Sequence, residues 1–332
     1  MIIKHIKLIN FRNHSEYIFD CKDETSLILG ENGSGKTSVL EAIYILTQGK
    51  SFRATDPEIL KHGTEYYRIE LEYENGEKTI ATYDGKNKQF IKLDKKTKRL
   101  SKKHKYPVVL FLPSDLNLID HSPGRRRDYF NRILSQLDEK YSTSISRYEK
   151  ALKQRNEILK RENVSKEELF SWNILLSKYG TEIYNSRKTF VQDLNSRLTE
   201  IYRTIAKNSD EIDITYKTEI EKGSEEYYLK KLEDSFLKDS YLGYTTFGIH
   251  KDDFVFNFNK NLANGSASRG ETRSVILALK FIEAKLIYEK LNQKPIVLLD
   301  DVFSELDEMR RKCLIENFKE NQVIITSVEK LF

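Results

Sequence analysis

The sequence predicts an α/β protein in which the two ends of the chain build one domain, with an antiparallel β lobe and an inserted helical arm. Three observations lead to this fold. Short apolar runs alternate with helical periodicity near residues 27–46 and again at 295–326. Alternating residues broken by hairpin turns occupy 66–93. Between 124 and 205 only the helical spacing of three and four recurs, which indicates an insertion rather than part of a sheet.

Strand signals occupy the first 29 residues. Short runs rich in apolar residues are separated by polar ones, and the last run is the apolar Leu27-Ile28-Leu29. After residue 37, Val39, Ile43 and Leu46 recur at spacings of four and three, which indicates one face of a helix. The residues between them therefore connect a strand to a helix. The predicted strands are Ile2–Ile9, Tyr17–Asp20 and Ser26–Leu29.

This connection fits the phosphate-binding pattern G-x-x-x-x-G-K-[ST] at every fixed position. Its glycines let backbone N–H groups close around a phosphate at the helix N-terminus. Lys36 adds a positive charge for the β- and γ-phosphates, and Thr37 offers a hydroxyl to Mg²⁺. A turn that merely joins strand to helix is the alternative, and the flanking elements disfavour it. The predicted nucleoside triphosphate loop consists of Gly30, Glu31, Asn32, Gly33, Ser34, Gly35, Lys36 and Thr37.

The predicted β lobe is followed by a strongly basic segment. Asn75-Gly76 and Asp84-Gly85 are hairpin signals within residues 66–93. Residues 84–105 contain nine Lys, one Arg and two Asp, a net charge of +8, whereas the whole chain carries +5. The basic character of the chain is therefore local.

The helical arm is predicted for residues 123–210. Apolar residues step by four and three from Phe130 to Leu152, and after a break near Glu162-Asn163-Val164 the stepping resumes from Trp172 to Ile205. This pattern predicts two long amphipathic helices joined by a short polar turn. The heptad-like stripe is more typical of ordinary helix packing than of a partner surface.

Strand and helix signals return after the arm. The apolar run Pro295–Leu299 reads as a buried strand and ends in Asp300-Asp301, and a helix and a last strand follow at Asp307–Phe318 and Gln322–Thr326. We therefore expect residues 1–122 and 211–332 to form the α/β head around the inserted arm.

Composition excludes several classes of protein. Hydrophobic residues make up 39% of the 332 residues and charged residues 32%. No apolar run approaches the roughly 18 residues of a membrane span, and the N-terminus lacks a signal-peptide core. Cys21 and Cys313 stand far apart without a CxxC pair, which argues for a reducing cytoplasm and against structural zinc or disulfides.

The two aspartates after the buried strand are the expected acidic partners of the phosphate loop. Asp300 would hold Mg²⁺ at the carboxyl end of the strand. Asp301 points the other way and would polarise the attacking water as a catalytic base, with Lys36 as the second catalytic residue. Two surface aspartates that close a strand are the alternative interpretation.

Ser268-Arg269-Gly270-Glu271 opens the helix that precedes this strand, so it offers N–H groups and a hydroxyl to an anion. By itself this segment reads as an ordinary N-cap. Its position about thirty residues before the Asp-Asp strand makes it resemble the signature sequence of the ABC-type ATPases of DNA repair. Ser304-Glu305-Leu306-Asp307 resembles the D-loop of the same proteins.

The resemblance narrows to the RecF family and extends over nearly the whole chain, with the motifs in family order. It implies an ABC-type P-loop ATPase head with an antiparallel β lobe and a helical arm. The residues that support it are Phe11-Arg12-Asn13, the run from Gly30 to Tyr44, Gly49-Lys50-Ser51-Phe52-Arg53, Pro113-Ser114-Asp115-Leu116, Arg125-Arg126-Arg127, Leu152-Lys153-Gln154-Arg155-Asn156, Gly248-Ile249-His250-Lys251-Asp252-Asp253 and the run from Asp300 to Asp307.

Membership of this family implies an ATP-dependent homodimer that binds DNA and hydrolyses ATP slowly, stimulated by DNA. Two ATP molecules would lie between the P-loop of one subunit and Ser268 and Gly270 of the other. RecF-like proteins act with RecO and RecR at single-strand gaps and at single-strand/double-strand junctions, in DNA replication, repair and the SOS response, and help to load recombinase. The resemblance also implies nucleotide contacts for Arg12 and Asn13, although an arginine at a strand end is usually just solvated. Gln48 is a candidate metal-sensing glutamine or, equally, the polar end of a helix. His250 is placed near the nucleotide, unless that histidine is structural.

The basic tract from Lys86 to Lys105 has two interpretations. A solvated lysine face is the usual one. In a RecF-like ATPase it is equally a surface for duplex DNA, and since few aromatic residues interrupt it, backbone contacts are favoured over base stacking. Arg125-Arg126-Arg127 is the alternative DNA surface.

The sequence departs from the family pattern at several positions. Ile249 and Lys251 stand where the family usually has Pro and Arg, and Glu271 where Gln is common. No switch histidine stands near Thr326-Ser327, and the sequence given is a little short for the family. The alternatives from other classes are an ABC transporter ATPase subunit, an ATPase-linked nuclease and a scaffold without activity. The intact loop and acidic pair disfavour the scaffold.

Overall fold

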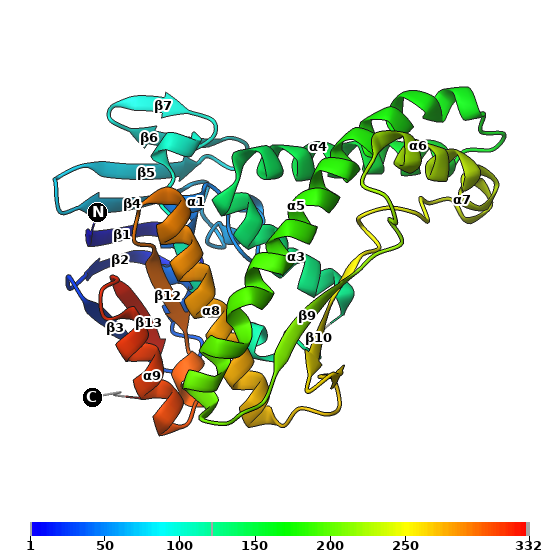
Figure 1. Ribbon diagram of the computed structural model, residues 1–332. Coiled ribbons are helices and arrows are strands. Elements are labelled where there is room, and N and C mark those ends of the chain that lie inside the picture. The colour runs from blue at the N-terminus through cyan, green and yellow to red at the C-terminus, as the bar shows by residue number, and fades with distance from the viewer. Residues whose placement is uncertain (1, 121, 330–332) are drawn as a thin grey trace. The chain divides into compact units, whose positions relative to one another are not determined.

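The computed structural model describes residues 2–120 and 122–329 and separates into two units (Figure 1). The first unit comprises Met1–Asp115 and Glu283–Phe332, and the second Leu116–Ile282. The second unit is larger than the arm predicted for residues 123–210. The reason is that β9 (Ile212–Lys217) packs on the long helix α5 (Lys166–Ala206), so the chain after the arm helices stays with them.

One sheet of the first unit is antiparallel and has the strand order β2-β1-β4-β5-β6-β7 (Figure 1). Buried and partly exposed residues alternate along β4, as expected of a strand with one face on a core. The predicted β lobe is therefore confirmed, and the first two strands of the chain belong to it. The strands are β1 Ile3–Phe11, β2 His14–Asp20, β4 Tyr67–Tyr73, β5 Lys78–Tyr83, β6 Lys88–Lys92 and β7 Lys95–Thr97.

The other sheet of the first unit is parallel, with the order β3-β13-β12-β8. Apolar residues fill its central strands β12 and β13, which are buried along their whole length. Because the strands run in parallel, the carboxyl ends of β3 and β12 meet at the same edge. The strands are β3 Thr25–Leu29, β8 Val108–Phe111, β12 Ile296–Asp300 and β13 Val323–Ser327.

Helix α1 (Lys36–Gln48) lies between these two sheets. It contacts β1, β4 and β5 of the antiparallel sheet and β8, β12 and β13 of the parallel one. Twelve of its 13 residues are buried, so the helix is covered on all sides rather than on the one face that the sequence pattern indicated. The unit also contains α2 (Asp56–Ile59), α9 (Glu308–Phe318) and the short 3-10 helices Lys102–His104 and Val302–Glu305, and a third 3-10 helix, Pro113–Asn117, crosses into the second unit.

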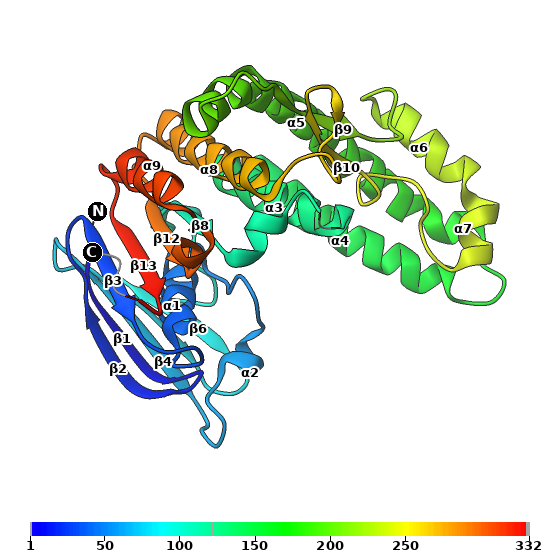
Figure 2. The same ribbon diagram turned by 90° about the horizontal axis from the view of Figure 1, so that it is seen from below.

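The second unit is built on α3 (Pro123–Leu137), α4 (Glu139–Leu159) and α5 (Figure 2). The sequence predicted two long helices, and the structure has three, because the chain leaves the helix at Asp138, whose side chain accepts a hydrogen bond from the Lys140 N–H and caps α4. The helices α4 and α5 pack along each other.

The remaining elements of this unit follow α5 in the chain. A three-stranded antiparallel sheet has the order β11-β10-β9, and α6 packs on α5. Helix α8 passes from the second unit into the first. No helix in residues 2–120 and 122–329 is long and apolar enough to cross a membrane. The elements are α6 Glu225–Asp234, α7 Phe236–Leu242, β10 Asp253–Phe258, β11 Asn261–Leu262 and α8 Arg269–Leu291.

Candidate functional site

The loop between β3 and α1 is shaped by glycines. Gly33 and Gly35 have φ angles of 84° and 97°, in the left-handed region that favours glycine. A Cβ atom on Gly35 would lie 2.3 Å from Nε2 of His14, so this position has no room for a side chain. Gly35 also caps α1 without a side-chain hydrogen bond. The N–H groups of the first helical turn therefore have no capping side chain, and they can donate to an anion.

Lys36 folds back over this loop. Its Nζ donates to the carbonyl oxygens of Gly30, at 2.6 Å, and Glu31, at 3.0 Å. The side chain is 8% exposed, so its charge is held close to the loop. Two of the three ammonium hydrogens are used in this way, which leaves one for a further acceptor such as a phosphate oxygen.

Two hydroxyl groups hold Asp300 at the end of β12. Oγ1 of Thr37 and Oγ1 of Thr326 donate to the same carboxylate oxygen, at 2.8 Å and 2.9 Å. The carboxylate and the Thr37 hydroxyl are hard oxygen ligands in direct contact, which suits Mg²⁺, since this ion is usually held by one or two protein oxygens together with water and phosphate. Within the described residues no cluster of three or more His, Cys, Asp or Glu side chains forms a ready metal site.

Asp301 differs from its neighbour in both backbone and side chain. Its φ angle is 53°, an uncommon value for a residue with a side chain. The backbone N–H is fixed by the carbonyl and the hydroxyl of Thr326, at 3.2 Å and 3.0 Å. Its Oδ1 atom is buried and, among the residues that the structure describes, has no hydrogen-bond partner. A carboxylate oxygen in this state can accept a proton or a hydrogen bond from water.

These groups border one cavity of about 600 Å³ in the first unit. It brings together most residues that the sequence indicated for the nucleotide. Gly30, Glu31 and Ser34 belong to the same loop, and Asp300 is joined to the cavity through Thr37. The cavity is lined by Arg12, Asn13, Asn32, Gly33, Gly35, Lys36, Thr37, Ser38, Arg53, Glu58, Leu60 and Asp301.

Arg12 and Asn13 reach the cavity from the turn between β1 and β2. Arg12 has a φ angle of 57°, and its guanidinium pairs with Glu41 at 2.8 Å. Nδ2 of Asn13 donates to the Gly33 carbonyl at 3.1 Å. This turn therefore borders the cavity and contacts the loop, and the contact of both residues with a nucleotide stays a prediction.

Glu41, which the sequence patterns did not indicate, pairs with Arg12 and Arg53, two arginines that line the cavity. Its side chain is fully buried and lies 2.9 Å from Nη2 of Arg53. Burial alone would raise its pKa, but hydrogen bonds from Arg12, Arg53 and Ser51 hold the pKa below the ordinary value of 4.5. A single acidic residue within the otherwise apolar stretch 39–46 was the available signal, because a buried carboxylate needs partners.

Gln48, the candidate metal-sensing residue, lies away from the phosphate loop. Gln48 is the last residue of α1, eleven residues after Thr37, which corresponds to about 16 Å along a helix. Its Nε2 donates to the Tyr106 carbonyl at 2.6 Å. The side chain therefore ties the far end of α1 to the chain before β8.

Ser268 and Gly270 lie at the start of α8, in the second unit. Ser268 and Glu271 form a reciprocal pair: the Ser268 N–H donates to the Glu271 carboxylate at 2.6 Å, and the Glu271 N–H donates to the Ser268 hydroxyl at 3.3 Å. This is a capping box, so within one chain the segment acts as an N-cap. Its service to the nucleotide of a second subunit stays a prediction.

The alternative DNA surface at residues 125–127 is engaged in the second unit. Arg126 donates to both carboxylate oxygens of Asp253, at 2.8 Å and 2.7 Å, and Arg127 donates to the Asp252 carbonyl at 2.7 Å. Since Arg126 is 9% exposed, two of the three arginines stabilise the fold rather than present charge to a ligand.

His250 belongs to the same buried region. Its Nδ1 is 2.8 Å from the hydroxyl of Tyr148, and its Nε2 is 3.0 Å from the Thr245 carbonyl. Burial lowers its pKa from 6.5 to about 4. The neutral ring is thus satisfied by partners of its own unit, as the structural interpretation of this residue requires.

Part of the basic tract also has structural partners. Lys88 pairs with Asp56 at 2.7 Å, and Nζ of Lys92 lies 5.6 Å from the centre of the Tyr73 ring. The lysines and the arginine around β7 differ, because Lys95, Lys96, Lys98 and Arg99 are all exposed.

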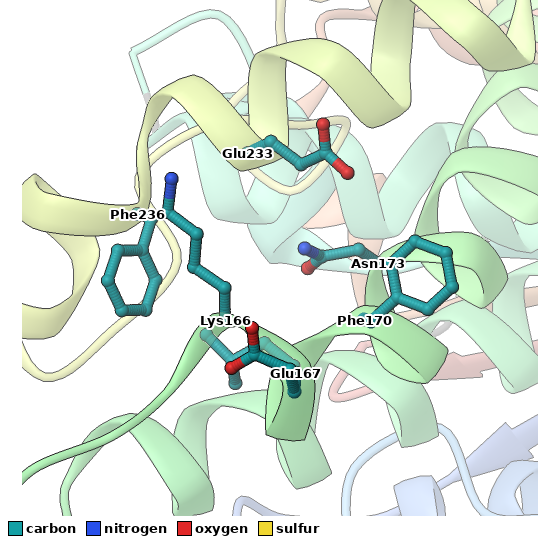
Figure 3. A pocket seen from close by; sticks show the side chains of 7 residues that line it. Lys166, Glu167, Phe170, Asn173, Glu233 and Phe236 are labelled. Carbon is teal, nitrogen blue, oxygen red and sulfur yellow. The ribbon is translucent and has the colours of Figure 1, made fainter.

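A second cavity, of about 400 Å³, lies in the second unit at the start of α5. Figure 3 shows the rings of Phe170 and Phe236 on opposite sides of it, with Lys166 between them. Glu167, Asn173 and Glu233 complete its polar lining. Nothing in this cavity resembles the phosphate loop.

Comparisons with known proteins agree with these features. Residues 2–107 match the family model described as RecF/RecN/SMC N terminal domain. The "DNA replication and repair protein RecF" of Ruminiclostridium cellulolyticum is 33% identical over 99% of this chain and 93% of its own length. The protein of the same name from Clostridium novyi is 34% identical over 98% of this chain and 92% of its own.

Solved structures of RecF are also similar to this chain. A structure of the recombination mediator protein RecF with ATPrS, described as part of the RecFOR pathway, is 28% identical, with a TM-score of 0.89 over 99% of this chain and 93% of its own. A corresponding RecF–ATP structure has a TM-score of 0.88. The Smc head domain derived from Pyrococcus furiosus shares the fold, with a TM-score of 0.51 at 13% identity.

Proposed function

The chain is a member of the RecF family of DNA replication and repair proteins, and on that premise we propose that it is a cytoplasmic ATPase that binds DNA as an ATP-dependent dimer. The observation that supports this proposal most directly is the contact between Thr37 and Asp300, at 2.8 Å. It joins the phosphate loop to the acidic end of β12, the arrangement that holds a metal-bound nucleotide in P-loop ATPases. The similarity over the full chain favours this function over a transporter subunit or a nuclease.

Each part of the cavity has a role in this proposal. Lys36 and the N–H groups of the first turn of α1 bind the phosphates of ATP. Thr37 and Asp300 would hold Mg²⁺, and the bound ion would neutralise part of the negative charge of the phosphates. Asp301 accepts a proton from the attacking water, and the buried, unpartnered Oδ1 atom supports this assignment.

The proposed dimer places each nucleotide between two subunits. The N-terminus of α8, with Ser268 and Gly270, serves the nucleotide held by the loop of a second subunit. Helix N-termini favour anions, and the Ser268 hydroxyl adds a donor. Binding of two ATP molecules would close the dimer on DNA, and hydrolysis would release it.

DNA contacts are proposed for the exposed basic residues around β7. Lys95 and Lys96 stand on the edge strand β7, and Lys98 and Arg99 follow it directly, so that all four can meet the phosphates of a duplex without reading its sequence. At gaps and junctions the protein would act with RecO and RecR to promote recombinase loading, as the pathway named for the RecF–ATPrS structure suggests.

Light scattering with and without Mg-ATP and duplex DNA tests the proposal. The parent protein should approach twice its monomer mass with Mg-ATP and bind DNA in that state. Lys36→Ala should remain monomeric, because no other side chain of the loop brings positive charge to the terminal phosphates. A Lys36→Ala protein that binds Mg-ATP normally and dimerises would contradict the site assignment. Purified RecO and RecR, added in turn to the DNA-bound dimer, test the partners.

A further inference from the structure

Glu41 is the strongest unexplained feature of the first unit. Its carboxylate, fully buried in α1, accepts five hydrogen bonds. Three reach Oε2, from Nε of Arg12 and from Nε and Nη2 of Arg53, and two reach Oε1, from Nη2 of Arg12 and the Ser51 hydroxyl. One carboxylate therefore fixes two guanidinium groups that both line the cavity of the phosphate loop.

The two arginines differ in what they have left to donate. All three nitrogens of Arg12 are engaged, since its Nη1 donates to the Glu58 carbonyl at 2.9 Å. Arg53 uses Nε and Nη2 on Glu41, and its Nη1 has no hydrogen-bond partner among the residues that the structure describes. Arg53 is also the more exposed of the two, at 37% against 22% for Arg12.

Glu41 further controls the backbone next to Arg53. The Ser51 hydroxyl donates to Glu41 and accepts from the N–H groups of Arg53 and Ala54, at 3.0 Å and 3.1 Å. The segment that carries Arg53 is thus tied to α1 through both its side chain and its main chain. A guanidinium held at this cavity, with a donor edge available, suits a phosphate oxygen.

We propose that Glu41 is a positioning residue that presents Arg53 to a phosphate of the nucleotide, while Arg12 is the fixed second member of the clamp. This inference rests on the proposed ATP site and adds to it a second cation beyond Lys36, together with the buried acid that orients it. Preorganised donors bind without the entropic cost of ordering a long side chain, so the gain should appear in nucleotide affinity.

Two readings of Glu41 predict opposite signs. If Glu41 acts only through its charge, its removal strengthens binding of the polyanionic nucleotide, because a nearby negative charge has gone. If it positions Arg53, its removal weakens binding, since the two guanidinium groups repel each other and lose their common acceptor. Titration of nucleotide-free protein with a fluorescent ATP analogue, in the presence of Mg²⁺ and without DNA, distinguishes the two.

Arg53→Gln should weaken ATP binding about tenfold, the worth of one charge-assisted hydrogen bond. Arg53→Lys should recover only part of this loss, because an ammonium lacks the fork geometry. Glu41→Gln should match Arg53→Gln, and the double variant should be no weaker than either single variant, since both remove the same interaction. Glu70→Gln, which breaks a pair with Arg68 away from the cavity, is the matched control and should leave the affinity unchanged.

Thermal unfolding of the nucleotide-free variants separates misfolding from loss of contact. If Glu41→Gln does not fold, the partly exposed Arg53 variants decide the phosphate contact and Glu41→Asp decides the positioning role, with a smaller loss expected. Parent-like affinity in Arg53→Gln would overturn the phosphate contact. Tighter binding in Glu41→Gln, or additive losses in the double variant, would overturn the positioning role. Failure of the parent itself to bind ATP would instead contradict the proposed function.

Discussion

At the scale of single residues, neighbouring aspartates at the end of β12 have different chemistry. Asp300 is held by the hydroxyls of Thr37 and Thr326, and a carboxylate with two donors is a stable metal ligand. Asp301 has a positive φ angle, and its buried Oδ1 atom has no hydrogen-bond partner within residues 2–120 and 122–329. Such strain and unsatisfied polarity are costly and cluster at functional sites. Asp301, which has the less favourable conformation and environment of the two, is thus the aspartate proposed as the catalytic base.

Asp301→Asn should therefore spare ATP binding and slow hydrolysis by roughly 10²–10⁴-fold, the usual worth of a positioned base. The ATP-bound dimer should then persist on DNA. Phosphate release at saturating Mg-ATP measures the rate, and nucleotide titration provides the control for binding. Turnover at the parent rate would place the base elsewhere.

His250 gives a second prediction at this scale. Burial lowers its pKa in the folded state to about 4, below the 6.5 of an ordinary histidine. Between these values the unfolded chain binds one more proton than the folded one, so the free energy of unfolding falls as the pH drops from about 6.5 to about 4, by up to about 1.4 kcal/mol per pH unit.

Urea unfolding of the parent and of His250→Gln at pH 7.5 and pH 5 measures this effect. Glutamine does not titrate and retains a donor and an acceptor for Thr245 and Tyr148. The parent should lose more stability than the variant on acidification. An equal loss in both proteins would mean that His250 is not kept neutral in the folded state.

At the scale of elements, the edge strand β7 and the turns on either side of it concentrate exposed positive charge. Lys88 and Lys92 of the inner strand β6 contact Asp56 and the Tyr73 ring, whereas β7 is the last strand of this sheet in the part of the chain that the structure describes. Charged residues on an edge strand also protect it against pairing with another chain. The same residues can therefore serve solubility, DNA binding or both, and the salt dependence of binding separates these uses.

Four phosphate contacts correspond to a slope of about −3.6 in log K against log salt, at roughly 0.9 per contact. Glutamine at Lys95, Lys96, Lys98 and Arg99 should flatten the slope for duplex DNA by about this amount and leave DNA-free ATP hydrolysis unchanged. The matched control places glutamine at four exposed lysines of α4 and α5. A slope that flattens only in the control would move the DNA surface to the helices. The control residues are Lys150, Lys153, Lys178 and Lys188.

At the scale of the whole molecule, the two halves of the proposed ATP site belong to different units. The phosphate loop is in the first unit and the N-terminus of α8 in the second. In a single chain Ser268 is engaged in a capping box with Glu271. In the proposed dimer, the N-terminus of α8 of one subunit would complete the site at the phosphate loop of the other, and assembly and nucleotide binding would then be one linked equilibrium.

Ser268→Arg should leave the ATP affinity of the monomer intact and block dimerisation. A mixture of Ser268→Arg and Lys36→Ala subunits restores one intact composite site, since each supplies the part that the other lacks, while the second site is doubly broken. Light scattering with Mg-ATP should then detect mixed dimers that neither variant forms alone. Complete absence of mixed dimers would count against the arrangement in trans.

The sequence by itself determined the features that depend on a few adjacent residues. The phosphate loop, the acidic pair after β12 and the β lobe follow from local spacing, because turn geometry, strand burial and helix periodicity act over short distances. The break between two helices at Asp138 could not be predicted from local spacing, because apolar residues keep their helical spacing on both sides of it.

Only the tertiary structure decided which distant residues meet. Strand β13 lies between β3 and β12 and so brings Thr326 to Asp300, and Arg126 finds Asp253 at a separation of 127 positions. Glu41 became part of the site because α1 is buried between two sheets, where a carboxylate needs the arginines of neighbouring segments. Gln48 lies outside the site because it stands at the end of the 13-residue helix α1 that is opposite the phosphate loop. Such pairings depend on how buried polar groups satisfy one another across the fold, which no local pattern encodes.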